Sequence, residues 1–393
     1  MKKKTLALLG STGSIGKTTL DIIKKTNRFK IVLIIANSNY RKIIYQIKFY
    51  KPRIVIVNNY KTFLKIKNTI RNKRIVLLNN ILDIKKYIKK IDITVAAIPG
   101  IAGLEPTIKF TELSKRILLA NKESIVCGWD LIKKKALMFK TELVSIDSEH
   151  FSINELIKNN STDEVEKIYI TASGGPFLNY SKKMFKSIKP KDAIKHPKWK
   201  MGKKISVDSA TLMNKVLEII EAIRLFPFRL SQYEIIIHPQ SLVHAIVMFK
   251  NGITKLLYHE PNMKIPIGNA LHHNKMNYSK ILMHKNKYKN TINNLDFFPV
   301  DKKKFPSVKL IPKMNINKSG PIIINAANEI FVDEFLKNNI HFNDISAFLD
   351  DVIRHKDYLK TSKIPSNSIK NIYKIDTWAR VLAFEIINRN KKH

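Results

Sequence analysis

The strongest constraint on the fold is a glycine cluster that follows the first apolar run of the chain. Thr5 to Leu9 is long enough for one buried strand, and it leads directly into Gly10 to Gly16 (GSTGSIG) and then into an amphipathic segment. A strand, a glycine-rich turn and a helix form the unit in which a parallel sheet binds nucleotide phosphates. The sequence therefore predicts a nucleotide-binding fold at the N-terminus.

The same alternation continues along the next part of the chain. Further apolar runs rich in Ile and Val alternate with amphipathic stretches, at Ile31 to Ala36, Ile54 to Val57, Ile75 to Leu78, Thr94 to Ile98, Ile117 to Ala120 and Val144 to Ile146. Strands that alternate with helices are typical of βαβ units and a parallel sheet. We therefore expect an α/β, Rossmann-like domain over residues 1–146.

The pattern changes after this domain, and 393 residues are more than one hydrophobic core usually serves. Mixed short elements broken by glycine- and proline-bearing turns predict a central α+β domain over residues 147–274. An Asn- and Lys-rich stretch over residues 275–304 is typical of a connecting arm. Residues 305–393 indicate a C-terminal helical bundle, with helices that include Asn325 to Leu336 and Trp378 to Arg389.

Composition narrows the classes of partner. The formal net charge of +40 suggests nucleic acid as a binding partner. However, the lysines are spread along the chain, without a basic tail or an interleaved aromatic platform. Dispersed charge gives non-specific attraction, so we expect no specific nucleic-acid partner. The apolar runs are too short to span a bilayer, and the single cysteine, Cys127, requires no oxidising compartment. We expect no membrane association and a cytoplasmic location.

The glycine cluster also has an ATP-binding interpretation, because Gly16-Lys17-Thr18 resembles the end of a P-loop. That motif requires a glycine five residues before Gly16, and this position is Ser11, so the spacing fails. An ATP-using phosphotransferase that depends on Lys17 stays open as an alternative, as does a purely structural turn.

The loop after the second apolar run bears on the choice of cofactor. Sites for NAD commonly place a carboxylate at the end of the second strand, where it holds the ribose hydroxyls. Here the loop reads Asn37-Ser38-Asn39, without an acid, and Arg41 and Lys42 follow it. This favours NADP over NAD, although a plain polar loop is an equal alternative.

Two carboxylates follow the last apolar run of the predicted sheet. Asp147 and Glu149 are separated by one residue, so both project from the same side of an extended segment. Carboxylate oxygens suit a hard divalent cation such as Mg²⁺ or Mn²⁺. The alternative is that Asp147 caps the following helix and Glu149 is an acid of its first turn.

A further polar region spans Asp208 to Glu218. Asn214 and Lys215 could bind a phosphate while Glu218 supplies another oxygen to a metal, since Lys215 and Glu218 share one helical face. Lys215 and Glu218 could equally form an exposed ion pair of little consequence. From the residues alone, Glu221 competes with Glu218 as the metal ligand.

Taken together, these motifs and their order resemble the 1-deoxy-D-xylulose 5-phosphate reductoisomerase family from about residue 5 to 390. The resemblance rests on Gly10 to Gly16, Leu119 to Ser124, Val144 to His150, Ser173 to Phe177, His196 to Gly202, Lys204 to Glu218, Ile237 to Ser241 and Asn325 to Glu329. It implies an N-terminal NADPH domain, a central catalytic and dimerising domain and a C-terminal helical bundle. It also implies a homodimer that uses NADPH and Mg²⁺ or Mn²⁺, with Co²⁺ as an alternative metal.

The activity implied is the rearrangement and NADPH-dependent reduction of 1-deoxy-D-xylulose 5-phosphate to 2-C-methyl-D-erythritol 4-phosphate, an early step of non-mevalonate isoprenoid biosynthesis. The residues implied as metal ligands are Asp147, Glu149 and Glu218. Those implied around the substrate are Lys122, Ser148, Glu149, Ser173, His196, Ser209, Asn214, Lys215 and Glu218, of which Lys122, Glu149 and His196 are catalytic candidates. Those implied as cofactor contacts are Thr12, Gly13, Ser14, Ile15, Asn39, Asn121, Glu123 and Gly202. His196 to Gly202 resembles a mobile loop whose Trp199 covers the site.

The chain departs from the family pattern at a few positions. Asn37 and Ser38 stand where the family has a glycine and a basic residue, which bears on the contact with the 2′-phosphate of NADPH; Arg41 is a candidate to compensate. Phe151, Glu155 and His273-Asn274 also differ from the family pattern, but none of these changes removes a proposed ligand. A different NADPH-dependent oxidoreductase on the same scaffold is the second alternative function.

Overall fold

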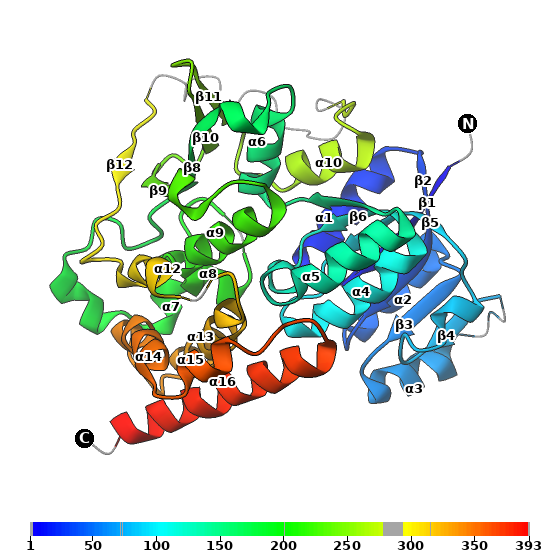
Figure 1. The fold of residues 1–393 in the computed structure, drawn as a ribbon. Coiled ribbons are helices and arrows are strands. Elements are labelled where there is room, and N and C mark those ends of the chain that lie inside the picture. The colour runs from blue at the N-terminus through cyan, green and yellow to red at the C-terminus, as the bar shows by residue number, and fades with distance from the viewer. Residues whose placement is uncertain are drawn as a thin grey trace. The chain divides into compact units, whose positions relative to one another are not determined.

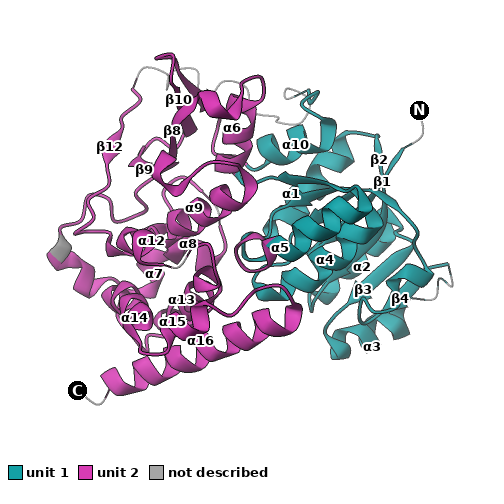
Figure 2. Ribbon diagram, in the orientation of Figure 1, with its two compact units in different colours: residues 1–124, 130–147, 263–285 teal, residues 125–129, 148–262, 286–393 magenta. Residues whose placement is uncertain are grey.

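The computed structural model describes residues 3–70, 72, 74–199, 201–277, 294–314 and 316–391. These residues form two compact units, which Figure 2 colours separately. Unit 1 comprises the described residues of Met1–Ser124, Asp130–Asp147 and Met263–Lys285, and unit 2 those of Ile125–Trp129, Ser148–Asn262 and Asn286–His393. The predicted division into three domains and an arm stays a prediction.

Unit 1 is built on a seven-stranded parallel sheet with the order β4-β3-β2-β1-β5-β6-β7. Its strands are β1 (Lys4–Leu9), β2 (Phe29–Ala36), β3 (Ile54–Val57), β4 (Val76–Leu78), β5 (Ile91–Ala96), β6 (Ser114–Leu119) and β7 (Glu142–Ser145). Each predicted apolar run forms one of these strands, so the prediction of a Rossmann-like parallel sheet is confirmed. The strand order reverses between β1 and β5, which is where sheets of this kind bind ligands.

Helices cover both faces of this sheet, which is why its strands are mostly apolar. The helices of unit 1 are α1 (Ser14–Lys25), α2 (Tyr40–Tyr50), α3 (Tyr60–Thr69), α4 (Leu104–Leu113) and α10 (Lys264–His272), while α5 (Lys122–Phe139) belongs to it except at its kink near Gly128. From β1 the chain adds strands in one direction along the sheet, and from β5 it adds them in the other. Because each crossover is right-handed, one face of the sheet is covered by α1 to α3 and the opposite face by α4 and α5 (Figure 1).

Helix α10 packs on the core of unit 1, although the sequence places it at the end of the predicted central domain. Ile267 and Leu271 of α10 belong to the same buried cluster as the strands of the sheet. The guanidinium of Arg116 on β6 donates to the carbonyl oxygen of Ala270 at 2.8 Å. A segment that returns to the first core after a long excursion cannot be recognised from local patterns.

Unit 2 contains a mixed five-stranded sheet with the order β11-β10-β8-β9-β12, in which only β8 and β9 are parallel. Its strands are β8 (Val165–Ala172), β9 (Tyr233–Ile237), β10 (Val243–Phe249), β11 (Thr254–Tyr258) and β12 (Phe298–Pro299). Helix α6 contacts β10 and β11, and helix α9 contacts β8. The edge strand β12 falls in the predicted connecting arm, of which residues 278–293 lie outside the described residues.

The rest of unit 2 is helical, as the sequence predicted for its C-terminal part. Its helices are α6 (Ser148–Ile157), α7 (Pro190–Ala193), α8 (Lys203–Ala210), α9 (Met213–Leu225), α12 (Leu310–Lys313), α13 (Gly320–Leu336), α14 (Phe342–Arg354), α15 (Tyr358–Ser362) and α16 (Ile369–Asn390). Helix α13 is buried along most of its length, and α14 and α16 pack against it. In the part of the chain that the structure describes, no helix is both long and apolar enough to cross a membrane.

Candidate active site

The glycine cluster forms the turn between β1 and α1 in unit 1. Helix α1 begins after Gly13 without a side chain that caps it and without an acid in its first turn. The first N–H groups of a helix lack partners within the helix and carry its positive end, so this terminus suits a phosphate. The predicted cofactor contacts Thr12 to Ile15 lie at this turn, at the carboxyl end of β1.

Gly16 explains why the third glycine of the cluster is needed. A side-chain carbon at this position would lie 2.4 Å from the carbonyl oxygen of Gly10. Only glycine therefore lets the first turn of α1 pack directly on the glycine turn. This close packing is a structural contribution to a nucleotide site and makes no use of Lys17, as a P-loop would.

The other cofactor candidates of unit 1 lie at the ends of neighbouring strands. The side-chain oxygen of Asn39, after β2, accepts a hydrogen bond from the N–H of Lys42 at 3.2 Å and caps α2. Asn121, after β6, caps α5 by accepting from the N–H of Ser124 at 2.7 Å, and it donates to the carboxylate of Glu123 at 2.9 Å. All of these residues follow parallel strands, so they share the carboxyl edge of the sheet. Gly202, the remaining candidate, lies in unit 2 and precedes α8.

Lys122 and Asp147 form an ion pair within unit 1. The Nζ atom of Lys122, at the start of α5, lies 3.2 Å from Oδ2 of Asp147, which follows β7. Both side chains are mostly buried. Asp147 ends the second segment of unit 1 and is bonded to Ser148, the first residue of α6, so the chain itself holds it beside Glu149.

Three charged side chains meet inside unit 2. Lys215 on α9 pairs with Glu218 one turn further along, with Nζ 2.7 Å from Oε2, and also with the carboxylate of Glu149 on α6. Glu218 is only 1% exposed. Burial alone would lower the pKa of Lys215, but the two carboxylates raise it, so the ammonium group stays protonated. This is a buried, charge-compensated cluster rather than the exposed ion pair that the sequence left open.

Neighbouring polar groups complete the hydrogen bonding of these two glutamates. The amide of Asn214 donates to Oε1 of Glu218, and the hydroxyl of Ser148 donates to Oε2 of Glu149 at 2.5 Å. Helix α9 starts after Leu212, whose φ of 59° lies in the left-handed region. That sharp turn aims the first turn of α9, with Asn214 and Lys215, at the start of α6.

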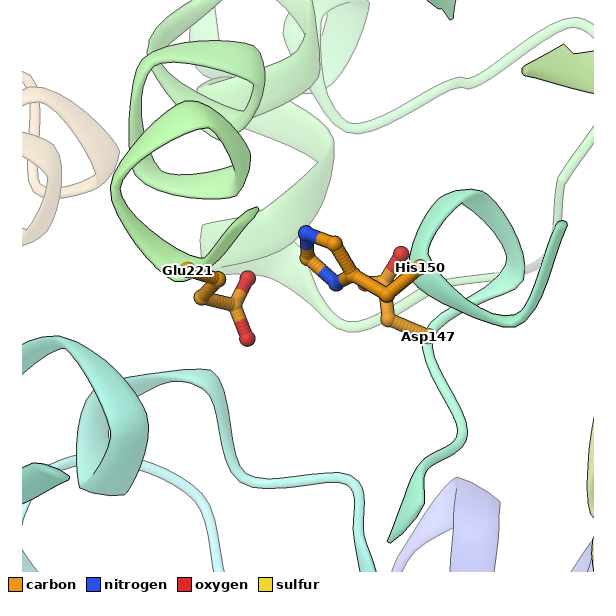
Figure 3. A group of neighbouring side chains, drawn as sticks. All are labelled: Asp147, His150 and Glu221. Carbon is orange, nitrogen blue, oxygen red and sulfur yellow. The ribbon is translucent and has the colours of Figure 1, made fainter. Parts of the chain in front are cut away.

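The carboxylates offer two groups of side chains that could hold a metal ion. In one, ligand atoms of Asp147, Glu149 and Glu218 all lie within 4.8 Å of one another. In the other, shown in Figure 3, Asp147 is joined by His150 and Glu221. The first group is the predicted ligand set. Glu221, which the sequence could not separate from Glu218, faces the ring of His150 instead (Figure 3).

Ser173 and His196 form a second polar pair in unit 2. Nδ1 of His196 accepts hydrogen bonds from the N–H groups of Lys198 and Trp199 at 3.1 and 2.9 Å, so the ring proton is on Nε2. Nε2 lies 3.0 Å from the hydroxyl of Ser173 and donates to it. Burial, with the nearby charge of Lys215, lowers the pKa of His196 to about 4. His196 is therefore neutral near pH 7, with a fixed tautomer.

One further serine, Ser209, is brought into this part of unit 2. Ser209 lies in the last turn of α8, and the backbone of Gly175 packs against it. Gly175 has a φ of 66°, and a side-chain carbon there would lie 3.0 Å from the carbonyl oxygen of Ser209. The glycine pair after Ser173 thus lets the two serine-bearing segments approach each other closely.

Trp199, in the predicted loop, packs edge-on against a buried histidine. Its ring centroid lies 5.9 Å from that of His244, which itself stacks on His259 at 3.8 Å. The loop residue Lys200 lies outside the described residues. No local sequence pattern places His244 or His259 next to the loop, because they come from β10 and from the residue that follows β11.

The contacts that hold α8 could not be predicted from local sequence patterns. The carboxylate of Asp208 is 1% exposed and accepts a hydrogen bond from the amide of Asn328 on α13 at 2.7 Å. It also pairs with Lys204, one turn earlier on α8, at 2.9 Å. Asn328 belongs to the motif Asn325 to Glu329, one of those that carry the family resemblance, and this motif was the sign that the residue matters. No local pattern connects it to Asp208.

Family models match three segments of the chain. The model described as 1-deoxy-D-xylulose 5-phosphate reductoisomerase matches residues 6–128, and the model of the C-terminal domain of that enzyme matches residues 143–226. A third model, described as the DXP reductoisomerase C-terminal domain, matches residues 259–382. The three matches follow the order expected from the sequence motifs.

Whole-chain relatives agree with these matches. A protein of Pelagibacter ubique named 1-deoxy-D-xylulose 5-phosphate reductoisomerase is 45% identical over 380 residues, which cover 95% of this chain and 97% of the relative. One of the same name from Wolbachia pipientis subsp. Culex pipiens is 40% identical, covering 98% of this chain and 97% of the relative.

Solved structures give the same result. A crystal structure of DOX-P reductoisomerase in complex with NADPH, fosmidomycin and magnesium is similar with a TM-score of 0.91, at 32% identity and 99% coverage of both chains. The Zymomonas mobilis enzyme in complex with NADPH is similar with a TM-score of 0.88, at 32% identity, covering 98% of this chain and 99% of the other.

Proposed function

Since this chain belongs to the 1-deoxy-D-xylulose 5-phosphate reductoisomerase family, we propose that Asp147, Glu149 and Glu218 hold the divalent cation of its reaction. The chain is an NADP-dependent oxidoreductase that converts 1-deoxy-D-xylulose 5-phosphate to 2-C-methyl-D-erythritol 4-phosphate in isoprenoid biosynthesis. It uses NADPH and a divalent metal ion, and the related structures support magnesium as that ion. We propose the roles of individual residues from their contacts in the site.

The donor set fits a hard cation. All three side chains offer carboxylate oxygens, which Mg²⁺ and Mn²⁺ prefer, and the ligand atoms lie within 4.8 Å of one another. The observation that carries the proposal is the burial of Glu149 and Glu218 around a single ammonium group, that of Lys215. Two carboxylates buried in this way require a positive charge between them, because unpaired buried carboxylates are costly.

The side chains around the cluster are suited to an anionic substrate. We assign Lys215, Asn214 and Ser209 to the phosphate of the substrate, because an ammonium, an amide and a hydroxyl can all donate to its oxygens. Ser173 and neutral His196 lie in the same unit, and the Nε2 proton of His196, which is donated to Ser173 here, could instead be donated to a substrate oxygen. Ser148 stays with Glu149 and orients its carboxylate.

When bound, the cation supplies Lewis-acid polarisation of the substrate oxygens, and NADPH supplies the hydride. The residues of the chain bind, orient and exclude water. Glu149 and Glu218 fix the acidic centre, and Lys122 orients Asp147 while its Nζ proton can be donated to a substrate oxygen. Trp199, anchored on His244, would cover the bound substrate and keep water out.

We assign cofactor binding to the carboxyl edge of the sheet in unit 1. The uncapped start of α1 at Thr12 to Ile15 would receive the cofactor phosphates, since its N–H groups have no side-chain partner. Asn39, Asn121 and Glu123 would line the same edge. Gly202, which precedes α8, stays a proposed cofactor contact.

We also propose that the chain forms a homodimer and is located in the cytoplasm. Strand β11 lies at one edge of the sheet in unit 2, and Ile253 and Leu256 at this edge are exposed. An exposed apolar edge strand is suited to pairing with a second copy of the chain. Sedimentation of the wild type beside Leu256→Lys would test this pairing, since the added charge should shift a dimer towards monomers.

The metal assignment is tested by Mn²⁺ binding, followed by electron paramagnetic resonance. Glu218→Gln should lose most of its Mn²⁺ affinity, whereas Glu221→Gln should retain most of it, and Glu166→Gln on the exposed side of β8 is the control. If Glu221→Gln lost the metal and Glu218→Gln kept it, the metal would belong to the group with His150, and the assignment would be wrong.

A further inference from the structure

Two lysines of unit 1 lie in the first turns of helices that begin at the same edge of the sheet. Lys17 lies in the first turn of α1, where its N–H bonds to the carbonyl oxygen of Gly13, and Lys42 lies in the first turn of α2. Lys17 lowers the pKa of Lys42, through a side-chain contact and through its positive charge. Both side chains are exposed to solvent.

Like charges in contact repel, and a carboxylate would normally separate or neutralise them. Among the residues that the structure describes, no ion pair joins Lys17 or Lys42 to an acid. Arg41, beside Lys42, adds a third cation to the same short stretch. The pair therefore offers two free donors and a local positive potential, which an anion held between them would relieve.

The position of the pair within the sheet indicates which anion. Strands β1 and β2 are parallel neighbours, so α1 and α2 both begin at the carboxyl edge. In folds of this type the loop after the second strand reads the adenosine ribose, where NADPH carries its 2′-phosphate. That loop is Asn37-Ser38-Asn39, which lacks both an acid and a cation.

We propose that Lys17 and Lys42 together bind the 2′-phosphate of NADPH and set the preference of this chain for NADPH over NADH. They would replace the cation missing from the second-strand loop. Lys17 then acts on cofactor choice and has no part in transferring a phosphate, as it would in a P-loop. The inference rests on the proposed function, because it concerns the cofactor of that reaction.

The test is equilibrium binding of NADPH and NADH, measured by cofactor fluorescence without substrate. Lys17→Gln and Lys42→Gln should each weaken NADPH binding on the order of tenfold, the loss expected for one charge-assisted hydrogen bond, and the double variant should weaken it further. NADH binding should be unchanged. Lys24→Gln on α1 and Lys48→Gln on α2 are matched controls that remove the same charge from the same helices.

Competition with adenosine 2′-phosphate and adenosine 5′-phosphate adds a probe of the phosphate position. The inference predicts that the two variants lose affinity for the 2′-phosphate compound only. Equal losses for NADPH and NADH, or losses as large in the controls, would overturn it. A wild type that prefers NADPH in this assay but turns over no substrate would count against the proposed function and leave the inference standing.

Discussion

The Nζ atom of Lys215 lies 2.7 Å from Oε2 of Glu218, one turn along α9, while it also pairs with Glu149 on α6. The ammonium group thus compensates the same two carboxylates that we assign to the metal. A divalent cation and Lys215 compete for these oxygens. Binding of the cation would release Lys215 to donate to the phosphate of the substrate, so the two binding events should be coupled.

Replacement of Lys215 by Gln should therefore separate metal binding from substrate binding. Without the competing ammonium group, we expect Mn²⁺ affinity to rise several-fold and the KM for the sugar phosphate to rise on the order of tenfold or more. The variant without metal should also be less stable, by about 3–5 kcal/mol, because two buried carboxylates lose their partner.

Titration with Mn²⁺ and thermal unfolding with and without metal would check this prediction. The stabilisation by Mn²⁺ should be larger in Lys215→Gln than in the wild type. A parallel loss of Mn²⁺ affinity and substrate affinity would show that Lys215 supports the metal site instead of competing with it.

The contact between Asp208 and Asn328 should position α8 and its Ser209. Asn328→Asp places a second carboxylate against buried Asp208, so we expect a loss of stability on the order of 3 kcal/mol and a higher KM for the substrate. Exchanging the two groups, in Asp208→Asn with Asn328→Asp, restores a carboxylate and an amide.

A double-mutant cycle by urea unfolding measures this coupling. The double variant should recover at least 1 kcal/mol relative to the sum of the single changes. Additive losses, with no recovery of KM, would mean that the two residues act independently.

Gly175→Ala should push the Ser173 segment away from Ser209. The added carbon meets the backbone of Ser209 and Ala210 at 3.0 Å, and the φ of 66° adds strain. We expect a loss of stability of about 2–3 kcal/mol and a raised KM. Gly252→Ala is the matched control, because Gly252 has a φ of 85° but no atom within 4 Å of the added carbon. Equal effects of both changes would mean that backbone strain alone, and not the close approach to Ser209, causes the loss.

His259 should make the stability depend on pH. Its ring is 8% exposed, and burial lowers its pKa to about 4, although the bond to the carbonyl of Glu260 opposes this shift. The unfolded chain takes up a proton near pH 6.5, whereas the folded chain does so only near pH 4. Stability from this residue is therefore present above pH 6.5 and is lost as the pH falls from 6.5 towards 4.

Urea unfolding of His259→Gln across this range tests that dependence. The slope of the unfolding free energy against pH should be smaller than in the wild type, by at most about 1.4 kcal/mol per pH unit. An unchanged slope would mean that His259 does not titrate differently in the folded and unfolded chains.

The sequence predicted the features that depend on neighbouring residues. Each strand of the parallel sheet came from a short apolar run, and the glycine turn between β1 and α1 came from the spacing of three glycines. The start of α16 was placed too late, because Ser368, which caps it by accepting from the N–H of Asn371, was not recognised.

Long-range contacts could not be read in this way. Lys215 and Glu149 are 66 positions apart, and Asp208 and Asn328 are 120 apart. Local spacing therefore could not decide whether Lys215 and Glu218 form an exposed ion pair or part of a binding site. It also could not decide whether Glu218 or Glu221 is the metal ligand. The contact of Lys17 with Lys42 likewise depends on how two helices begin at one sheet edge.

The central claim is that Glu149 belongs to the acidic centre of a metal-dependent reductoisomerase. The most direct measurement follows NADPH absorbance with 1-deoxy-D-xylulose 5-phosphate, with and without Mg²⁺ or Mn²⁺, for the wild type and Glu149→Gln. We predict metal-dependent oxidation of NADPH by the wild type and a loss of at least a hundredfold in Glu149→Gln. A folded wild type that leaves NADPH unoxidised with either metal, or a Glu149→Gln variant of full activity, would contradict the account.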